Sequence, residues 1–250
     1  MAGFGAAEDG DAGQRGCGPL IPPLSESMRP LRQQVFERVR ASGLIPRVQV
    51  AKDLGVSPAS VTTMTSELIE AGLIEEVAAP RETDIGRGRP AVALGVRAQA
   101  HLVAGMKMSD REQSAVIVDF AGNLIANEVN PRRPGPMPLP EMLDAMEALL
   151  ARVCAKAGIN RNELSGVGIG LPGFVDHAEG VALWSSTLTD RQVPLAQAAQ
   201  DRLGLPVTID NDANLGALAE VTWGPYADVA HLVYLKVATG IGAGLILAFV

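Results

Sequence analysis

The stretch IDNDANLGALAE, residues 209–220, decides the fold prediction for this sequence. It predicts a short buried strand, then a polar pair at the strand end, Asn211 and Asp212, and then a helix. A carboxylate at that position can accept a proton from a sugar hydroxyl as it attacks a phosphoryl group. Asn211 offers a donor and an acceptor to a neighbouring hydroxyl. The alternative interpretation is structural, because Asp212 or Asn214 could simply cap the helix.

Two further motifs stand on either side of this stretch. GIGLPGFVD, residues 168–176, predicts a buried strand that runs into a turn at Pro172 and Gly173, where backbone amides can meet a hydroxyl-rich ligand. ATGIGAG, residues 238–244, predicts a nest of backbone N–H groups that can hold a phosphate. Alone, such a Gly-rich turn is usually a hairpin. The order and spacing of the three motifs in one chain are much more specific. The phosphate-loop residues are Thr239, Gly240 and Gly242.

The region around these motifs, residues 98–250, alternates strands and helices after an antiparallel start, which predicts an α/β fold with a mixed sheet. The expected strands are residues 102–108, 114–120, 123–129, 165–171, 206–210, 231–237 and 244–250. The expected helices are residues 142–157, 195–203 and 214–223.

The N-terminal part has a different pattern. Residues 1–28 are rich in Gly, Ala, Asp and Pro without periodicity, which predicts a disordered tail. In residues 29–97 three short helical patterns are followed by a strand, a polar tip and a strand, the order of a winged helix-turn-helix. Ser57 followed by Pro58 predicts the start of the third helix, as an N-cap with Pro at the first helical position.

This layout predicts a DNA-binding surface. The second helix of a helix-turn-helix pair enters the major groove, and short hydroxyl side chains there can bond phosphates or base edges. The tip Gly-Arg-Gly-Arg-Pro can place two arginines in a narrow minor groove. The alternative is a small helical domain that contacts another protein. The DNA-binding candidates are Arg47, Ser57, Ala59, Ser60, Thr62, Thr63, Ser66, Arg87 and Arg89.

Composition and charge support this division of roles. The 250 residues are 47% hydrophobic, 20% charged and 4% aromatic, with a net charge of −7. The whole chain is therefore not a general polyanion binder. Residues 29–97 carry ten Lys or Arg against eight Asp or Glu, whereas residues 1–28 and 98–250 are both net acidic. The segment with the predicted helix-turn-helix is the one suited to meeting phosphates.

No sequence feature predicts export or membrane insertion. Cys17 and Cys154 are too few and too far apart for a disulfide framework, which favours a reducing cytoplasm. The N-terminus lacks the basic start and apolar run of a secretory signal. Residues 231–250 are apolar enough to suggest a membrane helix, but Lys236 and three glycines interrupt them, and their β-branched character favours strands.

Taken in order, a winged helix followed by GIGLPGFVD, IDNDANLGALAE and ATGIGAG resembles the ROK family of repressors, open reading frames and kinases. The resemblance covers residues 31–250. It implies an actin-like, ribonuclease-H-like sugar-kinase fold. It also implies a regulator of carbohydrate genes, mostly a repressor, that releases its DNA operator when a sugar or sugar phosphate binds. A homo-oligomer on a two-fold operator is expected.

The resemblance also brings in an alternative function, an ATP-dependent sugar kinase with an added DNA-binding domain. Kinases of the family have a first phosphate loop of the form Gly-x-Asp-x-Gly-Gly-Thr, and the matching stretch here is residues 105–111. Lys107 replaces the acid, and Ser109, Asp110 and Arg111 replace Gly-Gly-Thr. Lysine cannot hold Mg²⁺, and Asp110 would repel phosphate. In the second loop Ala238 stands where glycine is usual.

We therefore expect no phosphoryl transfer and no cofactor, with Asp212 as a vestigial base. The expected sugar-binding set is Pro172, Gly173, Asn211 and Asp212. The family's Cys-rich zinc stretch does not occur in residues 1–250, so no metal is expected. We also expect a C-terminally truncated chain with an incomplete second lobe, whose last two strands expose edges and an apolar face. A degraded fragment with neither activity is the third hypothesis.

Overall fold

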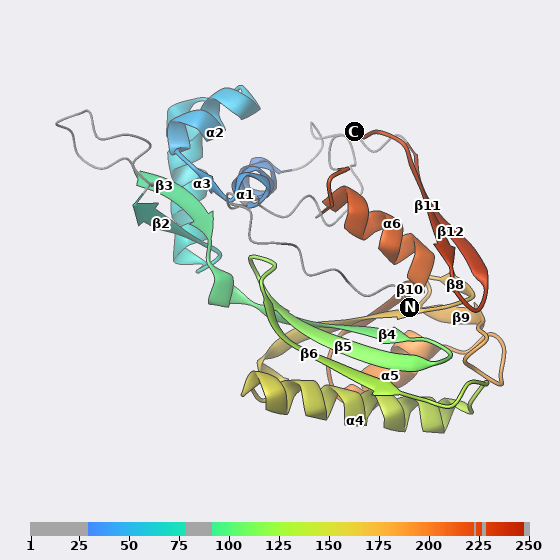
Figure 1. Cartoon of the computed structure of the whole chain (residues 1–250). Helices are drawn as coiled ribbons and strands as arrows, with labels where there is room; N and C mark the ends of the chain where they lie inside the picture. The colour runs from blue at the N-terminus through green and yellow to red at the C-terminus, as the bar shows by residue number, and fades with distance from the viewer. Residues whose placement is uncertain (1–29, 79–91, 223, 227–228, 248–250) are drawn as a thin grey trace, which may run out of the picture. The chain divides into compact units, whose positions relative to one another are not determined.

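The computed structural model describes residues 30–78, 92–222, 224–226 and 229–247 of the chain (Figure 1). The chain divides between Arg97 and Ala98 into two compact units. The first unit is Met1–Arg97, which includes the three predicted helices. The second unit is Ala98–Val250, which includes the three motifs of residues 168–244.

The first unit packs three helices against a small antiparallel sheet. The helices are α1 (Leu31–Ser42), α2 (Arg47–Leu54) and α3 (Pro58–Glu70). The strands are β1 (Leu44–Ile45), β2 (Ile74–Ala78) and β3 (Val92–Val96), in the order β1-β3-β2. Apolar side chains on one face of each helix, such as Val35 and Val39 one turn apart on α1 and Val61 and Leu68 two turns apart on α3, are almost fully buried and form the core.

The predicted start of α3 is confirmed. Ser57 is the N-cap, its Oγ accepts a hydrogen bond from the Ser60 N–H at 3.1 Å, and Pro58 follows at the first helical position. Thr65 lies fully buried on the inner face of this helix. The helix therefore turns its remaining hydroxyl side chains away from the core.

The strand pair that follows α3 is antiparallel, with Ile74 opposite Val96 and Ala78 opposite Val92. The segment between the two strands, residues 79–91, lies outside the described residues, and the predicted arginines Arg87 and Arg89 lie in it. The winged helix-turn-helix assignment therefore stays a prediction.

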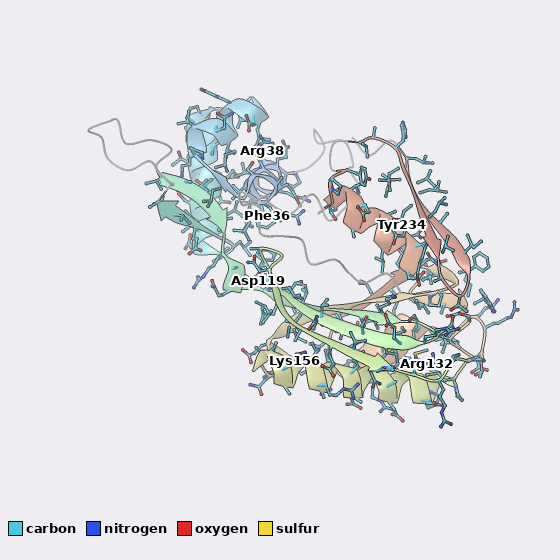
Figure 2. The ribbon with its side chains drawn as sticks, in the orientation of Figure 1. Phe36, Arg38, Asp119, Arg132, Lys156 and Tyr234 are labelled. Carbon is cyan, nitrogen blue, oxygen red and sulfur yellow. The ribbon has the colours of Figure 1, made fainter. Side chains whose placement is uncertain are left out.

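The second unit is built on a five-stranded mixed sheet in the order β10-β7-β4-β5-β6 (Figure 1). Strands β4, β5 and β6 form an antiparallel meander, and β7 and β10 add parallel to β4. Asp119 shapes the β5–β6 turn, because its Oδ1 accepts from the N–H groups of Ala121 and Asn123 at 3.0 and 2.9 Å (Figure 2). The strands are β4 (Leu102–Met108), β5 (Glu112–Asp119), β6 (Leu124–Pro131), β7 (Leu164–Leu171) and β10 (Val207–Asn211).

Helices α4 (Leu139–Ala157) and α5 (Leu195–Leu203) pack on this sheet (Figure 1). The inward face of α4 carries Met142, Met146, Leu149 and Val153, all fully buried. Short 3-10 turns η2 (Ala98–Ala100) and η3 (Arg161–Glu163) lead into β4 and β7. The mixed α/β fold predicted for this region is confirmed.

Helix α6 (Asp212–Thr222) contacts β7 and β10 of the sheet and also the hairpin β11 (Leu232–Val237) with β12 (Ile241–Ile246). Small residues allow this close approach. A Cβ on Gly216 would lie 2.6 Å from the ring of Tyr234, and one on Gly244 would lie 2.2 Å from the carbonyl oxygen of Ala213 (Figure 2). Gly216 and Gly244 thus serve the close packing of α6 against the hairpin.

The outer face of the β11–β12 hairpin is apolar and exposed in the described residues. Val237 and Ile241, which face each other across the ladder, are 77% and 83% exposed. Val233, Leu235 and Leu245 extend the same face. Residues 232–237 and 241–246 form strands, so the membrane-helix alternative is wrong, and no helix among the described residues is long and apolar enough to cross a membrane.

Several predicted boundaries differ from the structure. Helix α4 begins at Leu139 instead of residue 142, and α6 begins at Asp212 instead of Asn214. Strand β12 begins at Ile241 instead of Gly244, so part of the Gly-rich run is strand. A second hairpin, β8 (Phe174–Asp176) with β9 (Val181–Trp184), has no counterpart in the predicted strands.

Candidate functional site

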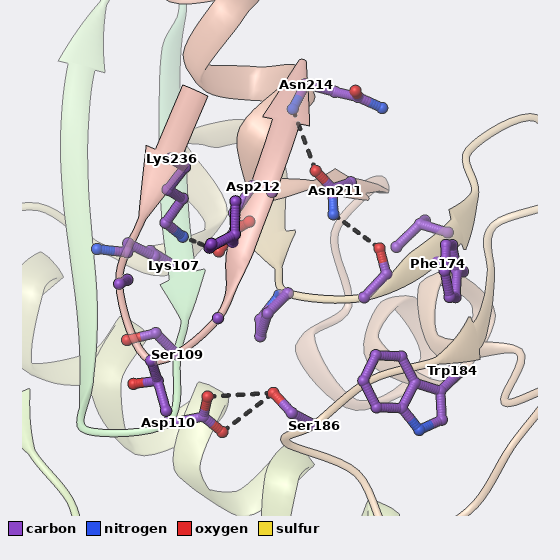
Figure 3. A pocket seen from close by; sticks show the side chains of 18 of the residues that line it. Lys107, Ser109, Asp110, Phe174, Trp184, Ser186, Asn211, Asp212, Asn214 and Lys236 are labelled. Carbon is purple, nitrogen blue, oxygen red and sulfur yellow. Dashed lines mark hydrogen bonds and ion pairs between the residues drawn. The ribbon is translucent and has the colours of Figure 1, made fainter. Parts of the chain in front are cut away.

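The three motifs meet at one cleft in the second unit. Its volume is about 1030 Å³, and it is lined by residues at the ends of β4, β10 and β11 and by the turn that follows β7. Figure 3 shows side chains that line it. Every predicted sugar-binding residue and every predicted phosphate-loop residue lines this cleft. The polar lining residues that bear on the argument are Lys107, Asp110, Ser186, Asn211, Asp212 and Lys236.

Asn211 caps α6 and ties it to the neighbouring turn. Its Oδ1 accepts from the N–H groups of Ala213 and Asn214 at 2.8 and 3.2 Å, and its Nδ2 donates to the carbonyl of Gly173 at 2.7 Å (Figure 3). The residue that caps the helix is therefore Asn211. The structural alternative, a cap at Asp212 or Asn214, is wrong. Asn211 has one N–H left for a ligand, so its main task is to hold the cleft in shape.

Gly173 takes a backbone conformation that this turn requires. Its φ is +121°, and a Cβ at this position would lie 2.1 Å from the carbonyl oxygen of Trp184. Only glycine fits there. The Pro172-Gly173 turn is thus fixed on one side by the Asn211 amide and on the other by the β8–β9 hairpin.

Asp212 is the first residue of α6, and its carboxylate forms an ion pair with the ammonium group of Lys236 on β11 (Figure 3). The Asp212 side chain is 9% exposed and that of Lys236 is 23% exposed. A substrate hydroxyl that needs this carboxylate must share it with the ammonium group. Sequence reasoning missed Lys236, although a lysine inside the apolar strand HLVYLKV was a signal that a buried partner was needed.

In the stretch that matches the first phosphate loop, residues 105–111, charged side chains are paired with neighbouring residues of the chain. Lys107 lies 3.5 Å from the Glu112 carboxylate across the β4–β5 turn, and both carboxylate oxygens of Asp110 accept from the Ser186 hydroxyl at 3.1 Å. Lys107 and Asp110 are thus both engaged by neighbouring side chains that line the cleft.

The second predicted phosphate loop is a tight hairpin turn. The Ala238 N–H donates to the carbonyl of Gly240 at 2.8 Å, and Thr239 lies between them. Gly242 already belongs to β12, opposite Lys236. Of the three predicted phosphate-loop residues, Thr239 and Gly240 lie in the turn and Gly242 lies in the strand, and phosphate binding by these residues stays a prediction.

The predicted DNA-contact face lies in the first unit and is exposed. Ser57, Ala59, Thr62, Thr63 and Ser66 are exposed and Ser60 is half-buried. The hydroxyls of Thr62, Thr63 and Ser66 donate to helix carbonyls one turn back, at 2.9, 3.2 and 2.9 Å. Each keeps its acceptor lone pairs, and each can rotate to donate to a phosphate.

Arg47 is held inside the first unit. Its Nη1 lies 2.7 Å from the Glu76 carboxylate on β2, and its Nε donates to the Thr65 hydroxyl on α3 at 3.0 Å. The guanidinium group therefore clamps α2 to α3 and β2. Lys52, on the same helix, is exposed and presents its charge to solvent.

Cys154 is part of the core. It lies on α4 with 4% exposure, and burial raises the pKa of its thiol. Among the described residues, no three His, Cys, Asp or Glu side chains are grouped to hold a metal ion.

The family follows from comparison with known proteins. The model of the ROK family matches residues 104–248, which include the whole cleft. The chain belongs to the ROK family. Its sheet and helices are those of the actin-like, ribonuclease-H-like fold that the family resemblance implied.

Relatives within the ROK family include regulators and kinases. The xylose repressor of Caldicellulosiruptor bescii is 30% identical over 213 residues, 85% of this chain and 52% of the relative. A solved ROK family transcriptional regulator, a homologue of Escherichia coli Mlc, matches with a TM-score of 0.70 and 26% identity over 87% of this chain and 54% of the other. A ROK glucokinase from Streptomyces griseus, solved with glucose and AMPPNP, matches with a TM-score of 0.53 and 27% identity over 60% of this chain and 45% of its own. The chain thus spans about half the length of the curated relatives it matches.

Proposed function

We propose that this ROK chain is a sugar-responsive, DNA-binding transcriptional regulator, a repressor of carbohydrate metabolism genes that acts in the cytoplasm as a homo-oligomer. One observation carries the proposal. The matches to regulators cover 85% and 87% of the chain, whereas the match to the glucokinase covers 60%. The second unit holds 153 of the 250 residues. The regulator matches must therefore extend into the first unit.

The first unit supplies the proposed DNA contacts. Helix α3 presents a face of small polar side chains, from Ser57 at its start to Ser66 two turns later. Small side chains let a helix lie deep in the major groove. Arg87 and Arg89 add positive charge between β2 and β3 in the sequence. In this proposal α3 reads base edges, Lys52 meets phosphates, and Arg47 supports α3 from behind.

The second unit supplies the proposed effector site. Pro172, Gly173, Asn211 and Asp212 form the sugar-binding part of the cleft, and Asp212 offers carboxylate oxygens to sugar hydroxyls. Binding there without phosphoryl transfer is the proposed role of Asp212.

The alternative is an ATP-dependent sugar kinase, which the likeness to the glucokinase favours. Three features of the cleft oppose it: Lys107 in place of an acid, Asp110 in place of a glycine, and the ion pair between Lys236 and Asp212. Purified chain, hexoses and ATP with magnesium should give no sugar-dependent release of ADP. Sugar-dependent release of ADP would establish the kinase, and it would contradict a cleft that binds sugar without phosphoryl transfer.

The regulator is tested by DNA binding. Fluorescence anisotropy with DNA from upstream of the chain's own gene should show salt-dependent binding that a sugar from a panel of pentoses and hexoses weakens. Replacing both Arg87 and Arg89 by Ala should lower affinity about tenfold or more, whereas Arg152→Ala on α4 should have no effect. Absence of specific binding, or equal loss in both variants, would contradict the proposal.

A further inference from the structure

Two aromatic side chains face each other on the wall of the cleft. Phe174 on β8 and Trp184 on β9 are paired across the hairpin, with ring centroids 6.0 Å apart and ring planes tilted by 46°. Both line the cleft, and they are 69% and 38% exposed (Figure 3). Aromatic residues make up only 4% of the chain. Two exposed aromatic side chains that lie side by side on the wall of a cleft indicate a binding surface.

The hairpin that carries the two rings is firmly anchored. Ala182 and Val193 exchange backbone hydrogen bonds of 2.8 and 3.0 Å, and Ala196 donates to the carbonyl of Gly180 at 3.0 Å. The anchor at the other end is Gly173, which has no room for a side chain. The rings therefore sit on a fixed support, as a preformed site requires.

The aromatic pair is directly coupled to the polar side of the cleft. Phe174 follows Gly173, whose carbonyl accepts the hydrogen bond from Asn211 at 2.7 Å. Figure 3 shows Phe174 and Trp184 on one side of the cleft and Asp212 with Lys236 on the other. The cleft thus has an aromatic side and a charged, hydrogen-bonding side.

This arrangement matches the two surfaces of a sugar ring. The hydroxyl groups around a pyranose need donors and acceptors, whereas its faces carry C–H groups. These C–H groups bear partial positive charge, and the face of an aromatic ring bears partial negative charge. An open-chain polyol has the same hydroxyl groups without a flat C–H face. A free phosphate has no C–H face at all.

We propose that Phe174 and Trp184 form an aromatic subsite that stacks on the C–H face of a pyranose ring whose hydroxyl groups bind on the Asp212 side of the cleft. The proposal rests on the proposed function and specifies its effector: a sugar in its cyclic form. The aromatic rings of Phe174 and Trp184 select the cyclic sugar over an open-chain polyol, because only the cyclic sugar has a flat C–H face. Phe174 and Trp184 are thus specificity-determining residues that are distinct from the predicted sugar-binding set.

Calorimetric titration tests the subsite. The probes are D-xylose, D-glucose, N-acetyl-D-glucosamine and cellobiose, with D-sorbitol as the open-chain match for D-glucose. The variants Phe174→Leu and Trp184→Leu keep an apolar side chain and remove the ring. Phe120→Leu is the control, because Phe120 lies outside the cleft lining, where its ring packs edge-on against His101 at 5.0 Å.

At least one cyclic sugar should bind the unchanged chain more tightly than D-sorbitol. Each cleft variant should lose about three- to tenfold in affinity for that sugar, the range expected for a ring-stacking contact. The double variant should bind the sugar and D-sorbitol within about twofold of each other. Phe120→Leu should bind as the unchanged chain does, and thermal melting should confirm that all variants fold.

The failures are distinguishable. A sugar that binds the unchanged chain and both cleft variants equally would overturn the subsite and leave the proposed function standing. Equal binding of D-sorbitol and its cyclic match by the unchanged chain would do the same. If no sugar binds the unchanged chain while DNA binding persists, the sugar response of the proposed function fails and the subsite fails with it.

Discussion

Helices α3 and α6 both begin at a polar side chain that caps the first turn, but their surroundings differ. The Ser57 hydroxyl bonds to the N–H of Ser60 in its own helix and is exposed. The Asn211 amide caps α6 and also reaches Gly173, 38 residues earlier in the chain. The next residue, Asp212, forms an ion pair with β11. Local sequence decides where each of the two helices begins. Hydrogen bonds and ion pairs with residues distant in the chain build only the start of α6 into the wall of a cleft.

The largest effect is expected from Asn211→Ala. The variant loses a helix cap and leaves the Gly173 carbonyl without its donor, so it should be destabilised by about 2–4 kcal/mol. Urea denaturation measures the change. Asn214→Ala is the matched control, because Asn214 uses its side chain in a single 3.2 Å bond to Asp210. Equal losses in both variants would show that Asn211 does not couple the motifs.

A smaller loss is expected from Lys236→Met. It leaves the nearly buried Asp212 carboxylate without its ammonium partner, which should cost about 1–3 kcal/mol, less than for a fully buried pair. The double variant with Asp212→Asn removes both charges and should recover most of the stability. Thermal denaturation of the single and double variants tests the coupling, and simple additivity of the two losses would argue against it.

For α3, Ser57→Ala should cost about 1 kcal/mol, the usual loss for a helix cap. Ser66→Ala removes a hydroxyl from the same helix that donates to Thr62, and should change the unfolding free energy by less than about 0.5 kcal/mol. Denaturation curves of the pair separate the cap from the exposed face. A larger loss for Ser66 would show that this face is packed against something and is not free for DNA.

The smallest effect on stability is expected from Leu235→Lys on the exposed face of β11. Leu235 is 67% exposed, so the change should alter the unfolding free energy by less than about 0.5 kcal/mol. It should nevertheless reduce self-association, because a charge interrupts an exposed apolar strand. Light scattering against protein concentration measures this. Unchanged scattering together with a large loss of stability would mean that this face is covered.

Sequence reasoning located what depends on local chemistry. Ser57-Pro58 marked the start of α3, and three short β runs in residues 102–129 marked the meander of β4, β5 and β6. It also placed Asn211 and Asp212 at the junction of a strand and a helix, which the structure confirms. The alternative that Asp212 or Asn214 caps the helix is wrong, because the Asn211 side chain accepts from the first free N–H groups of α6, those of Ala213 and Asn214.

What sequence reasoning missed depends on residues far apart in the chain. Lys236, the ion-pair partner of Asp212, is 24 positions away from it in the chain, and no local sequence pattern joins the two residues. The β8–β9 hairpin was missed because its strands are only three and four residues long. The turn residue Gly180 between two short apolar runs was the available signal. Without the hairpin, Phe174 and Trp184 had no reason to be considered together.

The central claim is that the start of α6 binds sugar while α3 binds DNA. The most direct test measures sugar affinity by calorimetry and DNA affinity by anisotropy on one preparation of Asp212→Ala. We predict that sugar affinity falls about tenfold or more, because hydrogen bonds to a charged carboxylate are lost, while DNA affinity without sugar stays within about twofold. Unchanged sugar affinity, or an equal loss of DNA affinity, would contradict the account.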